Sequence, residues 1–434
     1  MYFSSVRIHN FKAIQDMTLQ FKPGVNLLIG DNGVGKTSIL EALAVGLGGY
    51  LSGITGVSSK NILQTDVRIS SSTIAGASSA IAYMTPVEIA CEVNINGNQF
   101  SWTRMREDES GESKTKTVNP PKTTVPHRTI SLYAKEIAND VDSTLPLLSY
   151  LSTTRISLSK RGDFGSGLKK KLNDRRCGYI GCLDSSLDIK AIKAWCLKME
   201  LEAFQQERPI PEYEAFKKLV SSAMKKMSDL DSYPEIAYSR KFEDIVYNEG
   251  GQTLPISYLS AGYQSLLWMT MDIAHRMALL NPGRSDLGHT HGIVMIDELD
   301  MHLHPKWQWN VLTALEETFP NIQFIIATHS SILISSCKNE HLIRIDDQQE
   351  ITYLDAAYAY SIEDVVEFVQ GSSRIPQLAK ELSHKFEYAL NCDDTKNARE
   401  ILQMMIDEYG LDNSEVKIAM TELDLVASDF SEDK

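Results

Sequence analysis

The first third of the chain alternates apolar and polar residues, and this period of two is typical of β-strands. Residues 3–8 and 17–21 follow the alternation, so we expect two strands there. Residues 25–29 (VNLLI) are nearly all apolar, which indicates a strand buried on both faces. Helical spacing follows over 37–47, and we expect this helix to end at the glycine pair that comes next.

The next segments combine a loop, a hairpin and a buried strand. Residues 52–82 are rich in Ser, Gly, Thr and Ala, and they predict a long loop with little local structure. Alternation resumes over 87–93 and 98–104, and Asn96-Gly97 between them is a strong hairpin signal. The apolar run 146–151 predicts another buried strand.

The second half of the chain alternates apolar strands with helices, an order typical of α/β folds. Apolar residues spaced by three and four predict helices within 185–231, over 265–280 and over 305–318. Short apolar runs predict four strands, over 293–296, 324–328, 342–345 and 351–354. The predicted fold class is therefore α/β, with a sheet core, an antiparallel β part, an inserted helical lobe and a helical tail.

The tail from Ile375 onward is helical and acidic. Residues 371–434 contain seven Lys and Arg against fourteen Asp and Glu, which accounts for half of the net charge of −14. We expect three apolar faces: Leu378, Leu382, Phe386 and Leu390 on the first, Ile401, Met405 and Tyr409 on the second, and Ile418 with residues 420–423 on the third. These faces either cap the chain's own sheet or dock a partner. An acidic helical surface would suit a basic partner protein.

The most basic stretch runs from Arg155 to Arg176, with eight Lys and Arg against two Asp. It can bind the phosphates of a nucleic acid. It also fits a solvated loop, because aromatic residues that would stack on bases are sparse. The overall acidity argues against a surface built for generic nucleic-acid binding.

The six cysteines are scattered and form no CxxC pair, which argues against a zinc site or a disulfide framework. No apolar run reaches the roughly 18 residues that span a bilayer. The first residues, MYFSSVRIHNF, lack the apolar core of a secretory leader. We therefore expect a cytoplasmic protein without a membrane segment.

The most specific motif is GDNGVGKT at residues 30–37, which fits GxxxxGK[ST], the phosphate-binding P-loop. It lies between an apolar strand and a helix, as that motif requires. Glycines permit a tight turn whose N–H groups point at phosphate oxygens. Lys36 is expected to reach the β- and γ-phosphates, and the Thr37 hydroxyl is expected to ligate Mg²⁺. The residues expected to bind ATP here are Gly30, Asn32, Gly33, Gly35, Lys36, Thr37 and Ser38.

Two other predicted strands end in polar residues suited to ATP hydrolysis. One leads into Asp297 and Glu298, and the other leads into His329. Ligands of α/β sheets bind at the carboxyl ends of the strands, so these side chains can converge on the nucleotide. Asp297 can hold Mg²⁺, and Glu298 can act as general base on the attacking water. His329 can hydrogen-bond the γ-phosphate or that water.

The order of these motifs, together with LSAGYQ at 259–264, resembles the ATP-binding-cassette ATPases, in the branch that contains RecF, the SMC proteins and the OLD nucleases. Residues 1–49 and 253–350 carry the resemblance. It implies that Ser260 and Gly262 act in trans, on the γ-phosphate held by another subunit. It therefore implies a homo-oligomer built on head-to-tail dimers, with ATP and Mg²⁺ between the subunits.

A narrower likeness lies in the strings LSAGYQ, IDELDMHLHPKWQ, ATHSSILI and SYLSTTR. They resemble the stand-alone ATPases of bacterial antiphage systems, such as Septu PtuA and its retron-associated relatives. That resemblance implies a slowly hydrolysing ATPase that controls a separate HNH nuclease. Two alternatives stay open: a RecF-like DNA-repair ATPase without a nuclease partner, and a nuclease with an unrecognised active site in the tail.

The resemblance also suggests how the chain is divided. Residues 1–180 would form the N-terminal part of the ATPase domain, 181–250 a helical lobe, 251–370 the C-terminal part of the ATPase domain, and 371–434 an acidic tail that contacts a partner or another subunit.

Overall fold

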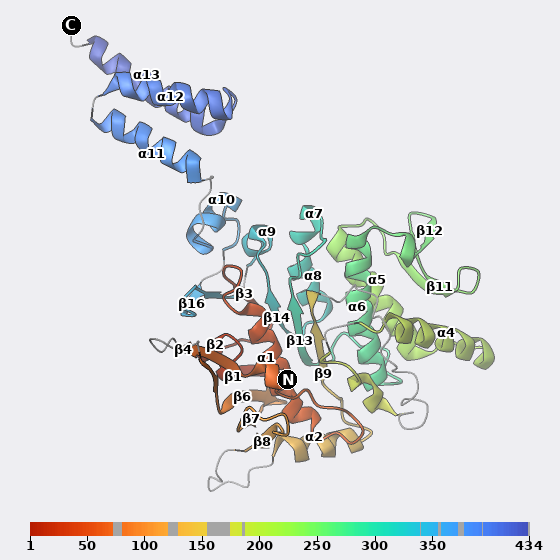
Figure 1. Cartoon of the computed structure of the whole chain (residues 1–434). Helices are drawn as coiled ribbons and strands as arrows, with labels where there is room; N and C mark the ends of the chain where they lie inside the picture. The colour runs from red at the N-terminus through yellow and green to blue at the C-terminus, as the bar shows by residue number, and fades with distance from the viewer. Residues whose placement is uncertain are drawn as a thin grey trace. The chain divides into compact units, whose positions relative to one another are not determined.

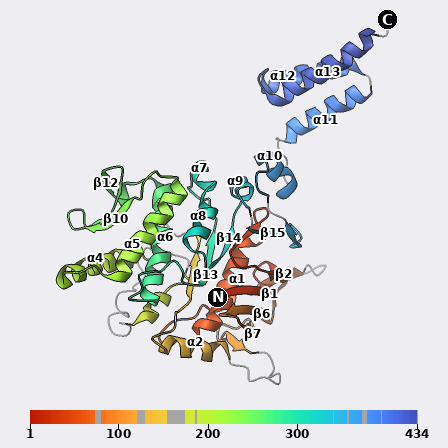
Figure 2. The same cartoon turned by 180° about the vertical axis from the view of Figure 1, so that it is seen from behind.

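The computed structural model describes residues 1–72, 80–119, 129–153, 174–184, 187–338, 340–354, 357–371, 377–392 and 394–432. The chain divides into two compact units, Met1–Tyr360 and Ser361–Lys434 (Figures 1 and 2). Among the described helices, none is both long enough and apolar enough to cross a bilayer.

A six-stranded sheet forms the centre of the first unit (Figure 1). In spatial order its strands are β16 Ile351–Leu354, β15 His341–Ile345, β3 Val25–Ile29, β14 Ile322–Ala327, β13 Gly292–Asp297 and β9 Leu147–Leu151. All are parallel except the edge strand β16. Every residue of β3, β9, β13 and β14 is buried, as in parallel sheets covered on both faces. The predicted α/β class is confirmed.

A second, antiparallel sheet has the order β2-β1-β6-β7-β8. Its strands are β1 Tyr2–Phe11, β2 Ile14–Gln20, β6 Val87–Ile95, β7 Asn98–Arg106 and β8 Lys116–Val118. Asn96 and Gly97 turn between β6 and β7 with φ of +51° and +81°, the positive values that an Asn-Gly hairpin turn requires. Helix α1 (Lys36–Leu51) contacts strands of both sheets, which explains why it is buried on nearly every side.

Helix α1 does not end at Gly48 and Gly49 as predicted, but continues beyond them. A Cβ at Gly49 would lie 2.3 Å from Nε1 of Trp102, and one at Gly48 would lie 2.5 Å from the carbonyl oxygen of Lys60. Trp102 Nε1 also donates a hydrogen bond of 2.9 Å to the carbonyl of Gly46. The glycines therefore permit close packing of α1 on its neighbours and do not terminate the helix.

The two helices predicted within 185–231 are α4 (Ile189–Gln206) and α5 (Pro211–Ser228). Both contact β10 of a three-stranded antiparallel sheet that the sequence pattern did not predict. Its strands are β10 Glu235–Ser239, β11 Asp244–Glu249 and β12 Gln252–Pro255. The long helix α6 (Ala261–Leu280) packs on β9 and on α5. Shorter elements are η1 Gln64–Asp66, α2 Ile130–Asn139, η4 Arg175–Tyr179, η5 Ile256–Tyr258 and α9 Ser331–Ser335.

Two more predictions were partly wrong. The expected loop 52–82 contains a hairpin of β4 (Arg68–Ser72) and β5 (Ala80–Met84), while its residues 73–79 lie outside the described part of the chain. The expected helix 305–318 is two helices, α7 (Pro305–Gln308) and α8 (Val311–Thr318). The helix is interrupted because Asn310 N bonds the carbonyl of Trp307 in a tight turn of three residues.

The second unit is helical. Its elements are α10 Ile362–Asp364, the π-helical turn η6 Val365–Val369, α11 Gln377–Asn391, α12 Thr395–Tyr409 and α13 Ser414–Glu432. A core within this unit consists of Phe386, Ala389, Ala398, Ile401, Leu402, Met405, Val416, Ala419 and Leu423. Ile418 and Met420 were predicted to be in the apolar face, but they are 53% and 39% exposed. Val416, Ala419 and Leu423 share the inner face instead, because their spacings of three and four follow the helical turn.

Candidate nucleotide site

Three predicted polar segments meet at one edge of the six-stranded sheet. Strands β3, β14 and β13 are parallel neighbours, so their carboxyl ends lie side by side. The loop 30–35 follows β3, and His329 comes shortly after β14. Asp297 is the last residue of β13, and Glu298 comes next. The fold thus brings together groups that lie up to three hundred positions apart in the sequence.

The loop between β3 and α1 has a tight backbone that depends on its glycines, of the kind expected for phosphate binding. Gly30 has φ +149°, and a Cβ there would lie 2.2 Å from the carbonyl oxygen of Ile345 on β15. Gly35 caps α1 with φ +106°, a left-handed conformation that favours glycine. Asn32 and Gly33 are exposed in the loop. Backbone N–H groups at the start of a long helix provide donors and a positive dipole for an anion.

Lys36 lies inside the curve of this loop. It is 6% exposed, and its Nζ donates hydrogen bonds to the carbonyl oxygens of Gly30 (2.7 Å) and Asp31 (2.8 Å). Burial lowers the pKa of this ammonium to about 8, although the Asp297 carboxylate acts in the opposite direction. Lys36 is therefore charged at neutral pH. The next two residues begin α1, with Thr37 exposed and Ser38 half-buried.

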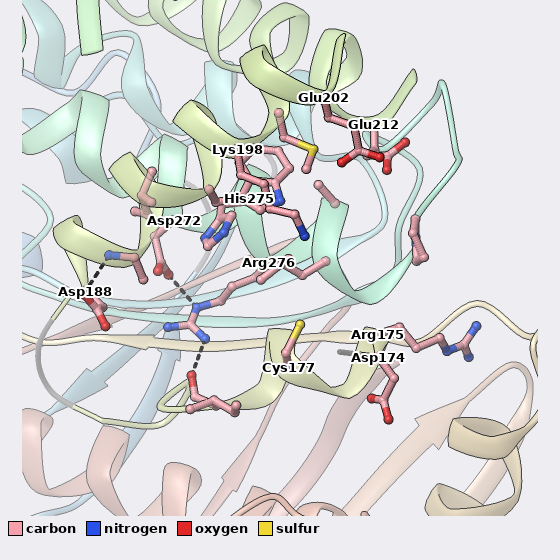
Figure 3. A pocket seen from close by; sticks show the side chains of 18 residues that line it. Asp174, Arg175, Cys177, Asp188, Lys198, Glu202, Glu212, Asp272, His275 and Arg276 are labelled. Atoms are coloured by element: carbon pink, nitrogen blue, oxygen red, sulfur yellow. Dashed lines mark hydrogen bonds and ion pairs between the residues drawn. The ribbon is translucent and has the colours of Figure 1, made fainter. Parts of the chain in front are cut away.

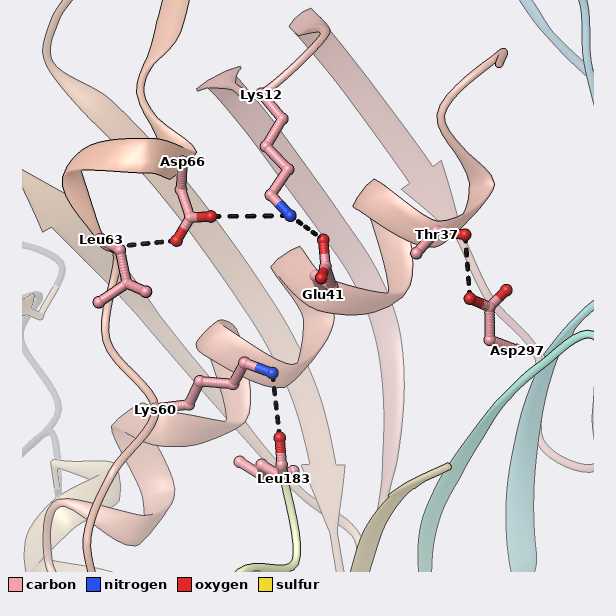
Figure 4. Close-up of polar contacts among 8 residues, drawn as sticks. All are labelled: Lys12, Thr37, Glu41, Lys60, Leu63, Asp66, Leu183 and Asp297. Atoms are coloured by element: carbon pink, nitrogen blue, oxygen red, sulfur yellow. Dashed lines mark hydrogen bonds and ion pairs between the residues drawn. The ribbon is translucent and has the colours of Figure 1, made fainter. Parts of the chain in front are cut away.

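Thr37 and Asp297 are joined across the site. Thr37 Oγ1 donates a hydrogen bond of 2.9 Å to Asp297 Oδ2 (Figure 4). Asp297 is 2% exposed, and a buried carboxylate needs such partners. A hydroxyl and a carboxylate are oxygen ligands of the kind that Mg²⁺ prefers. The two residues therefore fit the metal ion that accompanies ATP.

Glu298 and His329 frame the same edge. Glu298 has φ +48°, a left-handed conformation that is uncommon for residues other than glycine and turns the chain sharply after β13. Burial and the charge of Lys36 lower the pKa of the His329 imidazole. His329 is therefore neutral at pH 7 and has one N–H donor and one nitrogen acceptor.

A hydrogen-bonded series links the loop after β13 to the end of β14. Thr328 Oγ1 donates to Asp300 Oδ1 at 2.5 Å, and Ser330 N donates to Thr328 Oγ1 at 3.0 Å. Ser330 Oγ donates to Gln308 Oε1 at 2.6 Å. These bonds fix the backbone on both sides of His329. Our reading of the sequence missed these positioning residues, although the polar pair around His329 was a signal for them.

Ser260 and Gly262 lie at the start of α6. Ser260 is exposed, and its Oγ caps the helix by accepting a 3.4 Å hydrogen bond from Tyr263 N. Gly262 is buried and closely packed. A Cβ at this position would lie 2.7 Å from the carbonyl oxygen of His302 and 2.9 Å from the Trp307 ring. Within the described ranges, no hydrogen bond joins these two residues to the phosphate-binding loop of their own chain.

A second polar cluster lies beside α1 and was also missed (Figure 4). Lys12, between β1 and β2, forms ion pairs with Glu41 of α1 and with Asp66 of η1, the latter at 3.7 Å. Lys60 Nζ donates a 3.0 Å hydrogen bond to the carbonyl of Leu183. The Lys12 ion pairs hold the β1–β2 turn and η1 against α1.

Most of the predicted basic stretch, residues 154–173, lies outside the described part of the chain, as do residues 372–376 at the start of the tail. The two arginines at the end of the basic stretch, Arg175 and Arg176, lie in the described part. Arg175 donates to two backbone carbonyls, and Arg176 is paired with Asp174. Both cations are therefore already engaged within the protein.

Comparison with known families agrees with this geometry. A sequence profile described as an AAA domain matches residues 5–237, more than half of the chain, and one described as an AAA ATPase domain matches residues 197–334. The chain belongs to the AAA domain family. It is an ATPase, as the sequence motifs predicted.

Several curated proteins are similar to this chain. Retron Ec83 probable ATPase of Escherichia coli is 24% identical over 99% of this chain and 88% of that protein. Retron Vc95 probable ATPase of Vibrio cholerae is 25% identical over 79% of this chain and 73% of that protein. Septu protein PtuA of Bacillus thuringiensis is 23% identical over 93% of this chain and 92% of that protein. Among solved structures, an SMC head bound to the C-winged helix domain of ScpA has a TM-score of 0.49 at 16% identity, over 82% of this chain and 98% of that one.

Proposed function

We propose that this chain is the ATP-dependent regulatory subunit of a cytoplasmic antiphage system and that it controls a separate HNH nuclease. The observation that carries the proposal is the similarity to Septu PtuA over nearly the full length of both proteins. Similarity to two retron ATPases points in the same direction. The resemblance of the sequence strings to the Septu ATPases implies a separate partner nuclease, PtuB.

The proposed ATP cycle uses the groups at the sheet edge. The backbone of the phosphate-binding loop and Lys36 hold the phosphates, and Thr37 with Asp297 holds Mg²⁺, which neutralises phosphate charge. Glu298 acts as general base on the attacking water. His329, which is neutral, forms one hydrogen bond at the γ-phosphate. The contributing loop residues are Gly30, Asn32, Gly33, Gly35 and Ser38.

The site is proposed to be completed by a second copy of the chain. Ser260 is exposed at the N-terminus of α6, a helix of 20 residues whose dipole favours an anion there. Ser260 and Gly262 of one subunit would then contact the γ-phosphate bound by another, in head-to-tail dimers with two ATP molecules between the subunits. Hydrolysis would be slow until the dimer closes.

A nuclease active site within the chain is a weaker candidate. His304 Nδ1 accepts a 3.2 Å hydrogen bond from Lys306 N and so caps α7. This contact supports a structural role for His304. A nuclease site in the tail stays an alternative, which the test below addresses.

The test is coexpression with an HNH protein encoded beside this gene. The expected result is copurification, with nuclease activity that responds to ATP in the wild type and not in Lys36→Ala. Lys190→Ala, at an exposed position of α4, is the matched control. ATP-dependent binding to duplex or gapped DNA by the chain alone would favour the RecF-like function instead. DNA cleavage by pure chain carrying Glu298→Gln would favour a nuclease in its own right.

A further inference from the structure

A cavity of about 530 Å³ lies between α4, α6 and η4, and no residue of the phosphate-binding loop lines it (Figure 3). This volume is within the range of small-molecule sites. Its apolar lining includes Ile180, Ile192, Met199 and Leu279. Polar and charged groups line several parts of the wall, and α6 contributes two adjacent buried side chains, His275 and Arg276.

The first of these is a guanidinium with unused donors. Arg276 is 8% exposed, and its Nε donates a 2.8 Å hydrogen bond to Asp272. Its Nη1 donates to the carbonyls of Gly178 (3.1 Å) and Ile180 (3.0 Å). Nη2 has no hydrogen-bond acceptor among the residues that the structure describes. Because Arg276 lines the cavity and Nη2 is not among the fully buried atoms that lack a partner, this nitrogen is open to the cavity and can donate a hydrogen bond to a molecule bound there.

The second is the neighbouring imidazole. His275 is 7% exposed, and its ring centroid lies 4.9 Å from that of Trp195. In the described part of the chain, neither ring nitrogen has a hydrogen-bond partner. Burial and the adjacent Arg276 lower the pKa of His275 to about 3, so the ring is neutral and carries one N–H. The Lys198 side chain lines the same space (Figure 3).

The carboxylates nearest these donors are already engaged. Asp272 is paired with Arg276, and Asp174 with Arg176. Asp188 caps α4. Lys198 has no ion pair within the described ranges, so its ammonium is available to balance a ligand charge. This part of the cavity therefore offers donors and one positive charge.

Two glutamates also line the cavity and limit the charge of the ligand. Glu202 accepts a hydrogen bond from Gln206, and Glu212 accepts one from the backbone of Gly283. Figure 3 shows both carboxyl groups together, apart from the Arg276 guanidinium. They disfavour a dianion such as a phosphate monoester, and a monoanion remains compatible.

We propose that this cavity binds a small organic carboxylate, with the carboxylate at Arg276, His275 and Lys198 and the apolar body against Ile192 and Leu279. A carboxylate accepts several hydrogen bonds in one plane and carries a single charge. The proposal concerns binding without nucleotide, so it does not depend on the proposed function.

The test compares three compounds with one ring and different head groups: phenylacetate, phenylacetamide and phenethylamine. Each is titrated into the full chain by ligand-observed NMR. Alkylation by N-ethylmaleimide, followed by mass spectrometry, locates the binding, because Cys177 lines the cavity and the exposed Cys392 does not. Phenylacetate is expected to bind at least about tenfold more tightly than the amide. It is also expected to slow alkylation of Cys177 and not of Cys392.

Surface variants of α4 complete the test with little risk to folding. Ala191→Phe narrows the cavity, and Ala194→Phe, at an exposed position outside it, is the matched control. Lys198→Glu reverses the charge at the cavity, and Lys190→Glu reverses one elsewhere on α4. Each cavity variant is expected to weaken phenylacetate binding by at least about tenfold, and each control to leave it unchanged. Equal binding of the amide or the amine, or equal loss in the controls, would overturn the proposal.

Discussion

Thr37 Oγ1, at the start of α1, lies 2.9 Å from Asp297 Oδ2 and donates a hydrogen bond to it from 260 positions earlier in the sequence. Thr37 comes from the first turn of α1, directly after the loop 30–35, and Asp297 from the end of β13, so this bond joins the two halves of the candidate site. The pair provides the oxygen ligands proposed for Mg²⁺.

The Asp297→Asn variant is therefore expected to lose the benefit that Mg²⁺ gives to ATP binding. An amide retains a hydrogen-bond acceptor for Thr37 but lacks the negative charge that attracts the metal. The ratio of ATP affinities in Mg²⁺ and in EDTA should fall at least about tenfold. Fluorescent-nucleotide titration measures it, with the exposed Asp347→Asn as control. An unchanged ratio would remove Asp297 from the metal site.

Glu298→Gln is expected to bind ATP normally and to hydrolyse it at least about a hundredfold more slowly than the wild type, because an amide cannot accept the proton of the attacking water. Glutamine tolerates the left-handed backbone at φ +48° about as well as glutamate, so folding should be unaffected. Phosphate release and native mass spectrometry with ATP measure the two effects. The expected mass is that of a trapped dimer. A wild-type rate would show that another group is the base.

The trans arrangement can be tested with two inactive variants. Lys36→Ala should not bind ATP, and Ser260→Arg should be unable to close over ATP in its neighbour. Each alone should be inactive, whereas a mixture forms heterodimers in which one of the two sites is intact. We expect the mixture to recover roughly a quarter of the wild-type ATPase rate, since about half of randomly paired dimers contain one of two working sites. No recovery, with heterodimers verified by mass, would contradict head-to-tail closure.

The affinity for ATP should depend on pH through Lys36. Its pKa is lowered to about 8 by burial, so the folded protein loses this positive charge above pH 8. ATP binding then requires uptake of a proton, and affinity should fall by up to about tenfold per pH unit above that value. Calorimetric titration at pH 7, 8, 9 and 10 measures this slope. Circular dichroism verifies that the protein stays folded, and a flat profile to pH 10 would contradict the lowered pKa.

Gly49→Ala is expected to destabilise the protein by about 1–3 kcal/mol through overpacking. The added Cβ would lie 2.3 Å from Trp102 Nε1, well inside contact distance. Gly111→Ala is the control, because no atom lies within 4 Å of a Cβ at that position. Urea unfolding measures both variants. Equal stability of the two would show that α1 and β7 adjust without cost.

Local patterns were sufficient to predict the turn between β3 and α1 and the strand ends that lead into Asp297 and His329. In each case a continuous apolar run marks a buried strand, and the polar residues after it mark the sheet edge. The spatial order of those strands is not a local property. Nothing in the sequence alone placed β14 between β3 and β13, because that order depends on how the crossover helices pack.

The errors had physical causes of a different kind. The sequence alone suggested that Gly48 and Gly49 end a helix, whereas tertiary contacts with Trp102 and Lys60 explain them. The left-handed backbone of Glu298 has no sequence signal, because such strain is stabilised by the surrounding fold. The β4–β5 hairpin was hidden because a Ser-rich composition weakens the alternation by which strands are detected.

Strand β3, which leads into the phosphate-binding loop, pairs with β14 and β15, and both of these come from residues 322–345. At translation rates of roughly 5–20 residues per second, roughly 15–60 s pass between the synthesis of β3 and the synthesis of the strands that pair with it. A chain still on the ribosome therefore has no complete nucleotide site until nearly all of the first unit has been made. Truncated products of stalled synthesis would therefore be unable to bind ATP. They would also be unable to trap full-length subunits in inactive oligomers.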